Sequence, residues 1–222
     1  QIFQLNMSDA APAQKVLLIG ASGTIGTLVV KELEAREGIE IVKAGRSSGD
    51  VRVDVSDEAA IKAMFEEVGK VDHIVFTAGS GHFGPVSTMT AENVMTSING
   101  KFLSQANVTL IGQHYLNAGG SITLTSGVLS HMPIKLASSL SAANAAVDSF
   151  ALGVSIELDE GKRINVVSPG LLEESAAAFG PFFPGTIPVP GVEVAKAYIR
   201  VMFSGVTGKV LRVAADKWLS FQ

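Results

Sequence analysis

Hydrophobic residues along the chain fall into two alternating patterns. Short, continuous apolar runs rich in β-branched residues predict buried strands, and longer amphipathic runs between them predict helices. The runs that predict strands span residues 15–20, 39–45, 51–55, 71–79, 120–127, 163–170 and 209–213. The runs that predict helices span residues 24–36, 57–68, 91–117 with a break, 139–159 and 192–203. This alternation predicts an α/β fold: a Rossmann-type, doubly wound parallel sheet flanked by helices on both faces.

A single domain accounts for the whole pattern, because no repeat, linker or change of composition interrupts it. With 222 residues, of which 47% are hydrophobic, the chain is long enough to bury one sizeable core. We assign this domain to residues 15–222. We interpret residues 1–14, in which "QIFQLN" precedes the first methionine at Met7, as a cloning remnant or a disordered extension outside the fold.

Charge and cysteine content narrow the classes of partner. The net charge is -4 and no run of Lys and Arg is present, so neither nucleic acid nor an anionic membrane is expected to bind. The absence of cysteine excludes disulfides, thiolate metal sites and a cysteine nucleophile, and no metal site is expected. The longest charge-free apolar run near the start, residues 16–30, is too short to span a bilayer. We therefore expect a cytoplasmic protein that acts on a small-molecule substrate.

The stretch "GASGTIG" follows the first predicted strand and opens the first predicted helix. Its glycines allow a sharp turn and a close approach of the backbone to a pyrophosphate, which would then lie on free N–H groups at the positive end of the helix. The alternative is a glycine turn that serves packing alone. The candidate coenzyme-binding residues of this loop are Gly20, Ser22, Gly23, Thr24, Ile25 and Gly26.

The residue after the second predicted strand distinguishes two coenzymes. An acidic residue there would accept the adenosine ribose hydroxyls of NAD, but the chain has Arg46, followed by Ser47. A guanidinium suits a 2′-phosphate, so NADP(H) is favoured, and an ordinary solvated arginine is the alternative. The third predicted strand ends in "VDVSD", where Asp54 is a candidate for contacting the adenine edge, with Val55 beside it.

Four further motifs make the chain resemble a short-chain dehydrogenase/reductase from residue 15 to about residue 213. In this resemblance "FTAG" stands where the family usually has Asn-Asn-Ala-Gly, and "SINGKF" holds the family's helix-kinking asparagine. "ITLTSG" holds its catalytic serine, and "INVVSPG" forms the turn that covers the nicotinamide. The residues assigned to these roles are, in the same order, Ala78 and Gly79, Asn99, Ser126, and Pro169 and Gly170. The resemblance implies an NADP(H)-dependent oxidoreductase.

Two catalytic groups of the family are missing from "LSAANAAVDSF". The family generally carries a tyrosine and, four residues later, a lysine on this helix, and alignment places Leu140 and Asn144 at these positions. Leucine has no proton to give, whereas Asn144 retains a hydrogen-bond donor for a coenzyme ribose. The two tyrosines of the chain, Tyr115 and Tyr198, are not followed by a lysine at that spacing.

Three loop residues are candidates to replace the missing acid. His82, His131 and Lys135 follow strands at the end of the sheet where the pocket is expected, and a histidine there would titrate near neutral pH. Each is otherwise an ordinary polar loop residue. We retain as catalytic candidates Ser126, Asn99, Asn144 and His131, and as substrate-pocket candidates His82 and Leu140.

Residues 169–191, rich in proline and phenylalanine, lie where the family keeps its substrate lid. Aromatic side chains on a lid would favour an apolar or ring-bearing substrate. The alternative is a loop whose phenylalanines pack into the core. The aromatic candidates are Phe179, Phe182 and Phe183.

Three functions fit this sequence. The first is an NADPH-dependent oxidoreductase that reduces a small apolar carbonyl with an altered proton donor, or an imine whose reduction forms no alkoxide. The second is a non-catalytic NADP(H)-binding sensor or scaffold, and the third is a non-redox isomerase, cyclase or lyase on the same fold. We favour the first, because oxidoreductases prevail in the family that the chain resembles. The resemblance also implies a homodimer or homotetramer that assembles through helices around 100–117 and 139–159.

Overall fold

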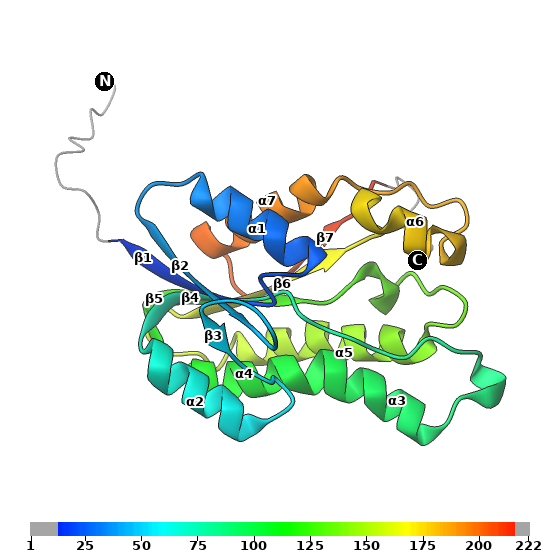
Figure 1. The fold of residues 1–222 in the computed structure, drawn as a ribbon, viewed down its shortest axis with the longest axis horizontal. Helices are drawn as coiled ribbons and strands as arrows, with labels where there is room; N and C mark the ends of the chain where they lie inside the picture. The colour runs from blue at the N-terminus through cyan, green and yellow to red at the C-terminus, as the bar shows by residue number, and fades with distance from the viewer. Residues whose placement is uncertain (1–12, 216–222) are drawn as a thin grey trace.

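Seven parallel strands form one sheet through the middle of the molecule (Figure 1). The structure, a computed structural model, describes residues 13–215. The strands are β1 (Gln14–Ile19), β2 (Ile39–Gly45), β3 (Val51–Arg52), β4 (Val71–Phe76), β5 (Leu116–Thr125), β6 (Arg163–Pro169) and β7 (Lys209–Val213). Their order across the sheet is β3-β2-β1-β4-β5-β6-β7.

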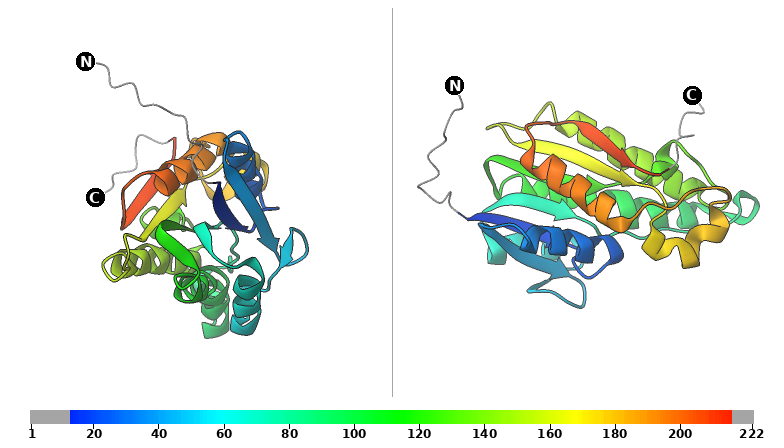
Figure 2. Two further views of the ribbon diagram at one scale, coloured as in Figure 1. Left: turned by 90° about the vertical axis from the view of Figure 1, so that its left-hand side faces the viewer. Right: turned by 90° about the horizontal axis from the view of Figure 1, so that it is seen from above.

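Two layers of helices cover the sheet, with α1, α6 and α7 above it and α2, α3, α4 and α5 below it in Figure 1. The two turned views of Figure 2 show the same separation of the layers. The helices are α1 (Thr24–Glu34), α2 (Glu58–Val68), α3 (Ala91–Ser97), the π-helix η2 (Ile98–Leu103), α4 (Ser104–Gly112), α5 (Ser138–Val154), α6 (Ala176–Phe179) and α7 (Gly191–Phe203). The predicted Rossmann-type fold is therefore confirmed.

The alternation of side chains along each strand divides the core into two clusters. Leu17 and Ile19 of β1 point into the cluster on the side of α2, where Phe65 is fully buried. Val16 and Leu18 point to the opposite face and pack with residues of α1 and α7. Both faces of β1 are thus buried, which explains why this strand is apolar throughout instead of alternating between apolar and polar residues.

The strand order reverses at β1, which pairs with β2 on one side and with β4 on the other. Chain connections leave the sheet in opposite directions at this point, so a crevice forms between the segments that follow β1 and β4. In open α/β sheets ligands bind in the crevice formed at such a switch point. The topology therefore places the candidate site after β1 and β4.

The helix expected over residues 91–117 differs from the structure in two ways. The expected break is a π-helix that joins α3 to α4 without interrupting the helical chain, and α4 ends at Gly112. Residues expected to be helical instead begin β5 at Leu116, four residues before the expected start. Leu116 pairs with Val71 of β4, and the positive φ of Gly119, +73°, allows an irregular stretch within the strand.

Three other boundaries differ from the predictions. The helix expected to reach residue 159 ends at Val154, next to a glycine at residue 153 that weakens helices. The strand expected over 51–55 pairs with β2 only at Val51 and Arg52. β1 begins at Gln14, which we had assigned to the extension and which pairs with Ile39. The rest of that extension, residues 1–12, and the end of the domain, residues 216–222, lie outside the described residues.

The expected lid, residues 169–191, contains short helices. A turn of 3-10 helix (Glu173–Ser175), α6 and a second 3-10 turn (Gly180–Phe182) follow one another. A bridge between Leu172 and Val189 closes the base of this segment. Across residues 13–215, no helix is both long and apolar enough to cross a membrane.

Candidate functional site

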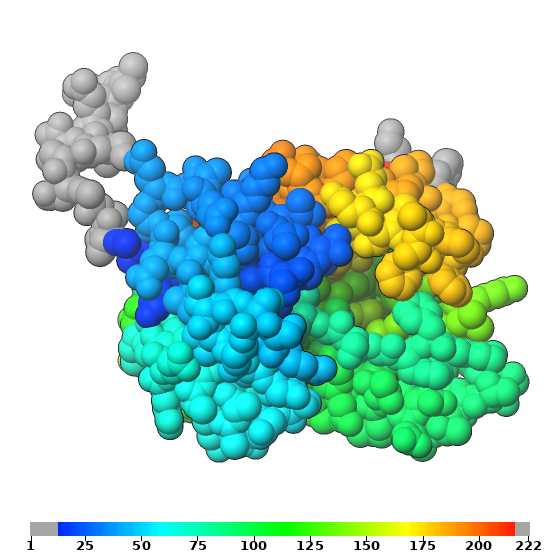
Figure 3. Space-filling view, in the orientation of Figure 1, coloured from blue at the N-terminus to red at the C-terminus, as the bar shows by residue number. Residues whose placement is uncertain are grey.

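A pocket of about 560 Å³ opens at the carboxyl ends of β1, β2 and β4, beside the N-terminus of α1. Figure 3 shows the surface hollowed where the blue segment of α1 faces the green and yellow segments. The predicted site residues that line this pocket are Gly20, Ser22, Gly23, Thr24, Ile25, Arg46, Ser47, Val55, Ala78, Gly79 and Asn99. The glycine-rich turn, the end of β2 and the end of β4 thus come together as the motifs had indicated.

Other predicted residues lie outside the wall of this pocket. They are Gly26, Asp54, Ser126, Asn144, Pro169 and Gly170, together with His82, His131, Leu140, Phe179, Phe182 and Phe183. Lining residues that were not among the predicted site residues are Ile19, Gly45, Val53, Ser56, Thr77, Ser80, Gly100, Ser104, Leu172 and Ser175. Some of these residues belong to the quoted motifs, but most have small or hydroxyl side chains, whose type alone does not indicate a binding role.

The three glycines of the first turn differ in why a side chain is or is not tolerated at their positions. Gly20 has a φ of +88°, and a Cβ added to it would lie 2.6 Å from the backbone nitrogen of Ala78. A Cβ on Gly26 would lie 2.1 Å from the carbonyl oxygen of Gly20, which no structure tolerates. A Cβ on Gly23 would meet that oxygen only at 3.4 Å. Gly20 and Gly26 therefore fix the close packing of the turn, and Gly23 leaves space in the pocket.

The N-terminus of α1 offers unpaired backbone donors to the pocket. Gly23 is the N-cap and has no side chain to cap the helix, and the first helical hydrogen bond runs from the N–H of Thr27 to the Gly23 carbonyl at 2.9 Å. Within the described residues, no acceptor binds the N–H groups of Thr24, Ile25 or Gly26. Free N–H groups together with the helix dipole favour a negatively charged group at this position.

A positive charge lies at the far side of the same pocket. The Arg46 side chain, directly after β2, is 76% exposed, and its Nη2 atom lies 3.7 Å from Oδ1 of Asp54. Asp54 in turn accepts hydrogen bonds from the hydroxyl and the N–H of Ser56, at 2.7 and 3.0 Å, which lower the pKa of its carboxyl group, as does nearby Arg46. Because the ion pair is long and exposed, the guanidinium remains available to an incoming anion.

The loop after β4 is tied to β1 and to the π-helix. The hydroxyl of Thr77 donates to the carbonyls of Ile19 and Gly20, each at 3.1 Å. The N–H of Ser80 donates to the carbonyl of Gly100 at 3.1 Å. These bonds hold the floor of the pocket against the helix that carries the asparagine of "SINGKF", which lies in η2 as predicted for a break in this helix.

Two buried residues that do not line the pocket carry polar atoms without partners. Ser126 and Asn144 are each only 3% exposed. Within the described residues, neither the Ser126 hydroxyl nor the Asn144 Oδ1 atom has a hydrogen-bond partner. The Asn144 amide lies next to the residue after Ser126, since a Cβ added to Gly127 would lie 3.3 Å from Asn144 Nδ2. A buried polar group without a hydrogen bond lowers the stability of the fold, unless a ligand supplies that hydrogen bond. Both groups are therefore suited to bind a ligand.

The Leu140 side chain packs against the loop after β4. Its side chain lies so close to Gly81 that a Cβ on that glycine would meet Leu140 Cδ2 at 2.2 Å. The Ser97 hydroxyl accepts the N–H of His82 at 2.9 Å and lies 2.9 Å from the Ser139 hydroxyl. The loop is therefore fastened to both α3 and α5 around Leu140.

The candidates for a replacement acid have other surroundings. The ring of His131 accepts the Nε–H of Arg212 at 3.3 Å and lies 3.1 Å from the Ser130 hydroxyl. Burial, followed by the charge of Arg212, lowers the pKa of His131 below its ordinary value, and the charge of Asp148 opposes this shift. Lys135 is exposed, and His82 is half-buried with its ring against Gly84.

The lid carries an aromatic cluster. The rings of Phe179 and Phe182 lie 6.2 and 5.7 Å from the ring of Phe83, which belongs to the loop after β4. Phe83 had no sequence signal, because a single aromatic residue in a loop is common. Phe183 follows them in the chain and is half-buried. The lid is thus closed onto the loop after β4 by aromatic contacts.

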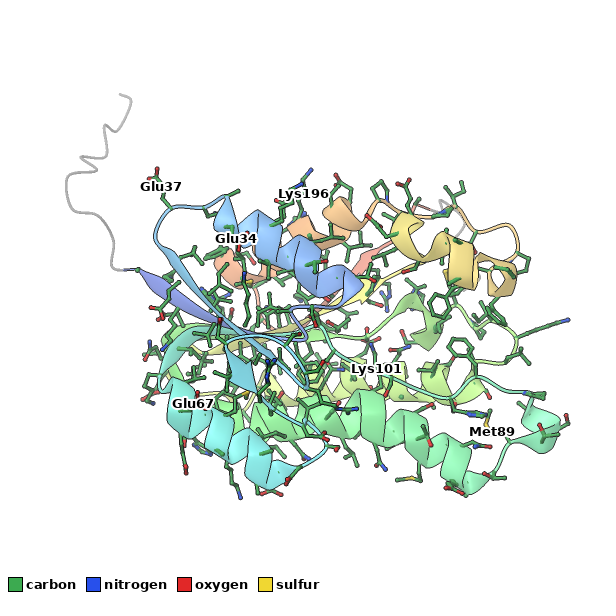
Figure 4. The ribbon with its side chains drawn as sticks, in the orientation of Figure 1. Glu34, Glu37, Glu67, Met89, Lys101 and Lys196 are labelled. Carbon is green, nitrogen blue, oxygen red and sulfur yellow. The ribbon has the colours of Figure 1, made fainter. Side chains whose placement is uncertain are left out.

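A lysine of the π-helix lies at the edge of the pocket, and no motif had indicated it. A Cβ added to Gly79 would lie 3.0 Å from Cδ and 3.4 Å from Nζ of Lys101, so the lysine side chain lies directly over this pocket residue. Figure 4 labels Lys101 near the middle of the molecule, while Glu34, Glu37 and Lys196 lie on its outside. In the described part of the chain, no three His, Asp or Glu side chains come together as ligands of a metal ion would.

The fold and the position of this pocket are those of Rossmann-type proteins. Comparisons with known proteins identify the family within this class. The family model described as Enoyl-(Acyl carrier protein) reductase matches residues 20–187. The protein named Short-chain dehydrogenase/reductase ATR9, from Stachybotrys chlorohalonatus, is 29% identical over 85% of this chain and 90% of its own length. The chain belongs to the short-chain dehydrogenase/reductase family of oxidoreductases.

Two solved structures are similar over nearly the whole chain. The crystal structure of the protein lin1944 from Listeria innocua is 45% identical, covers 90% of this chain and 100% of that chain, and has a TM-score of 0.88. A small-chain dehydrogenase in complex with NADPH is 28% identical, covers 90% of this chain and 96% of that chain, and has a TM-score of 0.81.

Proposed function

We propose that this protein is an NADP(H)-dependent oxidoreductase that transfers a hydride to a small apolar carbonyl or imine. The observation that carries the proposal is the exposed Arg46 guanidinium across the pocket from the free N–H groups at the start of α1. These two groups suit the 2′-phosphate and the pyrophosphate of one coenzyme molecule. The similar small-chain dehydrogenase in complex with NADPH supports this proposal.

Residues that line the pocket, together with several outside its wall, would bind the coenzyme in order along its length. Residues 22–25 would hold the pyrophosphate, because Gly23 leaves open space where a side chain would intrude. Arg46 and Ser47 would hold the 2′-phosphate, and Asp54 with Val55 would contact the adenine. Candidates for the nicotinamide end are Ala78, Gly79, Asn99, Asn144, Pro169 and Gly170.

The reaction centre that we propose differs from that of most of the family. Leu140 and Asn144 occupy the tyrosine and lysine positions, so the usual proton donor and its neighbouring cation are absent. The Ser126 hydroxyl, buried and unpaired, would donate a hydrogen bond to the substrate oxygen, and the amide of Asn144 would orient the coenzyme ribose. A bound reduced coenzyme supplies the hydride. A positioned acid is typically worth about 10²- to 10⁴-fold in rate, so these groups alone would catalyse slowly.

Binding of the coenzyme should stabilise the fold with a preference for the phosphorylated form. At about one hundred times its dissociation constant, NADPH should add roughly 2.7 kcal/mol to the free energy of unfolding. For a domain of this size that is a rise of about 5–10 °C in Tm. Differential scanning fluorimetry with NADPH, NADH and no nucleotide measures it. Equal shifts with both nucleotides, or none with either, would contradict the proposal.

The aromatic cluster supports a substrate with apolar or ring character. Phe83, Phe179 and Phe182 present ring surfaces from both the lid and the loop after β4. Aromatic pairs of this kind contribute about 1 kcal/mol each beyond simple burial. A ring-bearing substrate could take part in the same stacking once the lid opens.

Replacing Phe83 with alanine should open the lid, because it removes both ring pairs. The free energy that holds the lid closed would fall by about 2 kcal/mol, which would raise the fraction of molecules with an open lid roughly 30-fold. Limited digestion with chymotrypsin, followed by mass spectrometry of cuts after Phe179, Phe182 and Phe183, measures this opening. Phe83→Tyr keeps the ring and should digest at the wild-type rate. If the alanine variant digests no faster than the wild type, the ring contacts do not hold the lid.

A non-catalytic NADP(H) sensor is the second candidate, favoured by the packing of Leu140 onto Gly81. That contact fills the space beside Gly81 and the Ser97 hydroxyl with an inert side chain. For a sensor, coenzyme would raise Tm while no carbonyl or imine is reduced.

We further propose that copies of the chain associate through the outer face of η2, α4 and α5. Exposed leucines along this face support the proposal: Leu103 is 38% exposed, Leu110 52% and Leu152 59%. Small side chains between them, such as exposed Ala142, would allow close approach of another helix.

A further inference from the structure

The π-helix gives Lys101 an unusual position for a lysine. A π-turn leaves backbone carbonyls without their ordinary helical partners, and here side groups satisfy them. Buried Gln105 donates from Nε2 to the carbonyls of Lys101 and Thr125, at 2.7 and 2.9 Å, and accepts the N–H of Thr125 at 2.8 Å. Gln105 thus fastens the backbone of Lys101 to the residue that precedes Ser126.

The ammonium group of Lys101 has no partner of its own. Nζ forms no ion pair and no hydrogen bond with any residue in 13–215. It lies over Gly79, which lines the pocket, and Gln105 joins the backbone of Lys101 to Thr125, the residue before Ser126. Asn144 in turn lies next to Gly127, the residue after Ser126. Both Ser126 and Asn144 carry buried polar atoms without partners. A cation and two incomplete polar groups are therefore carried by segments that contact one another next to the pocket.

The charges around Lys101 come from few residues. Three helices pack against the π-helix; α3 contributes Glu92, α4 contributes no titratable side chain, and α5 contributes Asp148. Asp148 is the residue whose charge acts on Lys101, and its Oδ1 atom is buried without a partner. Burial lowers the pKa of Lys101 to about 8, against the opposing effect of Asp148. The amine can therefore exchange a proton near neutral pH, as an acid catalyst must.

We propose that Lys101 is a catalytic residue whose ammonium supplies the positive charge and the transferable proton that Leu140 and Asn144 do not provide. The inference rests on the proposed oxidoreductase function. In a reduction, the substrate carbonyl carbon gains a hydride from the reduced coenzyme, which becomes oxidised, and the C=O π electrons move to the oxygen. That oxygen forms an O–H bond as an N–H bond of Lys101 breaks. The neutral amine then regains a proton from water.

Chemical labelling of Lys101 tests the proposal without any substrate. Brief acetylation with acetic anhydride at pH values from 6 to 11, followed by mass spectrometry, gives the fraction of each amine that is neutral. Lys101 should become reactive around pH 8, whereas Lys196, whose pKa is raised by its hydrogen bond to Glu193, should react only at higher pH. Saturating NADPH should reduce the labelling of Lys101 at least 10-fold and leave Lys196 unchanged.

The outcomes separate this inference from the proposed function. If NADPH raises Tm but the labelling of Lys101 is unaffected, or if Lys101 titrates together with Lys196, the inference is overturned and coenzyme binding stands. If NADPH neither raises Tm nor protects Lys101, the proposed function is contradicted, and the inference that rests on it is contradicted as well. The labelling decides the inference even if no tested compound is reduced.

Two variants separate the charge from the proton. Lys101→Arg keeps a cation that cannot deprotonate, and Lys101→Met removes both. The probe is the diketone 1-phenyl-1,2-propanedione. Both variants should reduce it roughly 100-fold more slowly than the wild type, while the arginine variant keeps wild-type affinity for NADPH. Lys196→Met is the matched control and should match the wild type. Full activity of either Lys101 variant would overturn the proposal.

The pH profile gives a readout that a structural role would not change. The acid must be protonated, so kcat/KM of the wild type should be constant below pH 8 and fall above it. Lys101→Arg should lack this fall. Asp148→Asn removes the carboxylate that raises the pKa of Lys101, so the fall should begin at lower pH. A fall that stays in place in both variants would contradict the assignment.

Discussion

Replacing Arg46 with aspartate should reverse the coenzyme preference. The substitution removes the guanidinium that faces the pocket and puts a carboxylate where the 2′-phosphate would bind, so NADPH loses an attraction and meets a repulsion. Removing one partner of such a charge pair costs about 3 kcal/mol, or roughly 100-fold in Kd. NADH carries no 2′-phosphate, and its ribose hydroxyls can donate to the new carboxylate. Titration of both nucleotides by quenching of protein fluorescence measures the change.

Arg52→Asp is the matched control for this experiment. Arg52 lies on β3, is exposed and does not line the pocket, so the substitution makes the same change in net charge nearby. The control should bind NADPH within about twofold of the wild type, because exposed charges at a distance are screened by salt. Equal losses of NADPH affinity in both variants would mean that long-range charge, and no direct contact by Arg46, determines coenzyme choice.

Alanine substitutions at Gly26 and Gly23 should distinguish the effect of the first turn on stability from its effect on NADPH binding. Gly26→Ala forces a methyl group against the Gly20 carbonyl, 2.1 Å away, so the start of α1 must move. Overpacking against backbone costs about 3 kcal/mol, which lowers Tm by roughly 6–12 °C in a domain of this size. Gly23→Ala meets the same oxygen at 3.4 Å and should cost about 1 kcal/mol or less.

Both alanine variants should nevertheless lose NADPH. In Gly26→Ala the N–H groups of the helix are displaced, and in Gly23→Ala the new methyl group occupies space that the pyrophosphate requires. Melting curves with and without NADPH give both quantities from one preparation. A Gly23→Ala variant that keeps the full NADPH shift would show that the coenzyme does not lie on this turn.

The sequence predicted the fold well because its signals are local and regular. A strand buried on both faces, such as β1, needs a continuous apolar run, and a strand-to-helix turn as close as that at Gly26 accepts only glycine. These constraints act between residues that are near one another in the chain. The alternation of strands and helices predicted the parallel, doubly wound sheet, whereas the order of its strands was not predicted from the sequence.

The parts that the sequence did not reveal depend on contacts between distant segments. Phe83 joins the lid cluster only because the loop after β4 lies against α6 in the folded chain. The early start of β5 at Leu116 depends on pairing with Val71, which overrides a helical pattern. The lowered pKa of His131 comes from burial and from Arg212 on β7, 81 residues away along the chain. Only the folded chain brings such groups together.

The wide turn between α3 and α4 changes how many neighbouring residues one helix can offer to a ligand. In an α-helix, three successive side chains point about 100° apart, so a binding surface meets one or two of them per turn. Here Asn99 and Gly100 line the pocket, and Lys101 lies over Gly79 in its wall. A helix that accommodates one additional residue per turn can therefore acquire a new functional group without any change in loop length. Enzymes built on this scaffold have in that device a route to new chemistry that leaves the sheet and its crossovers intact.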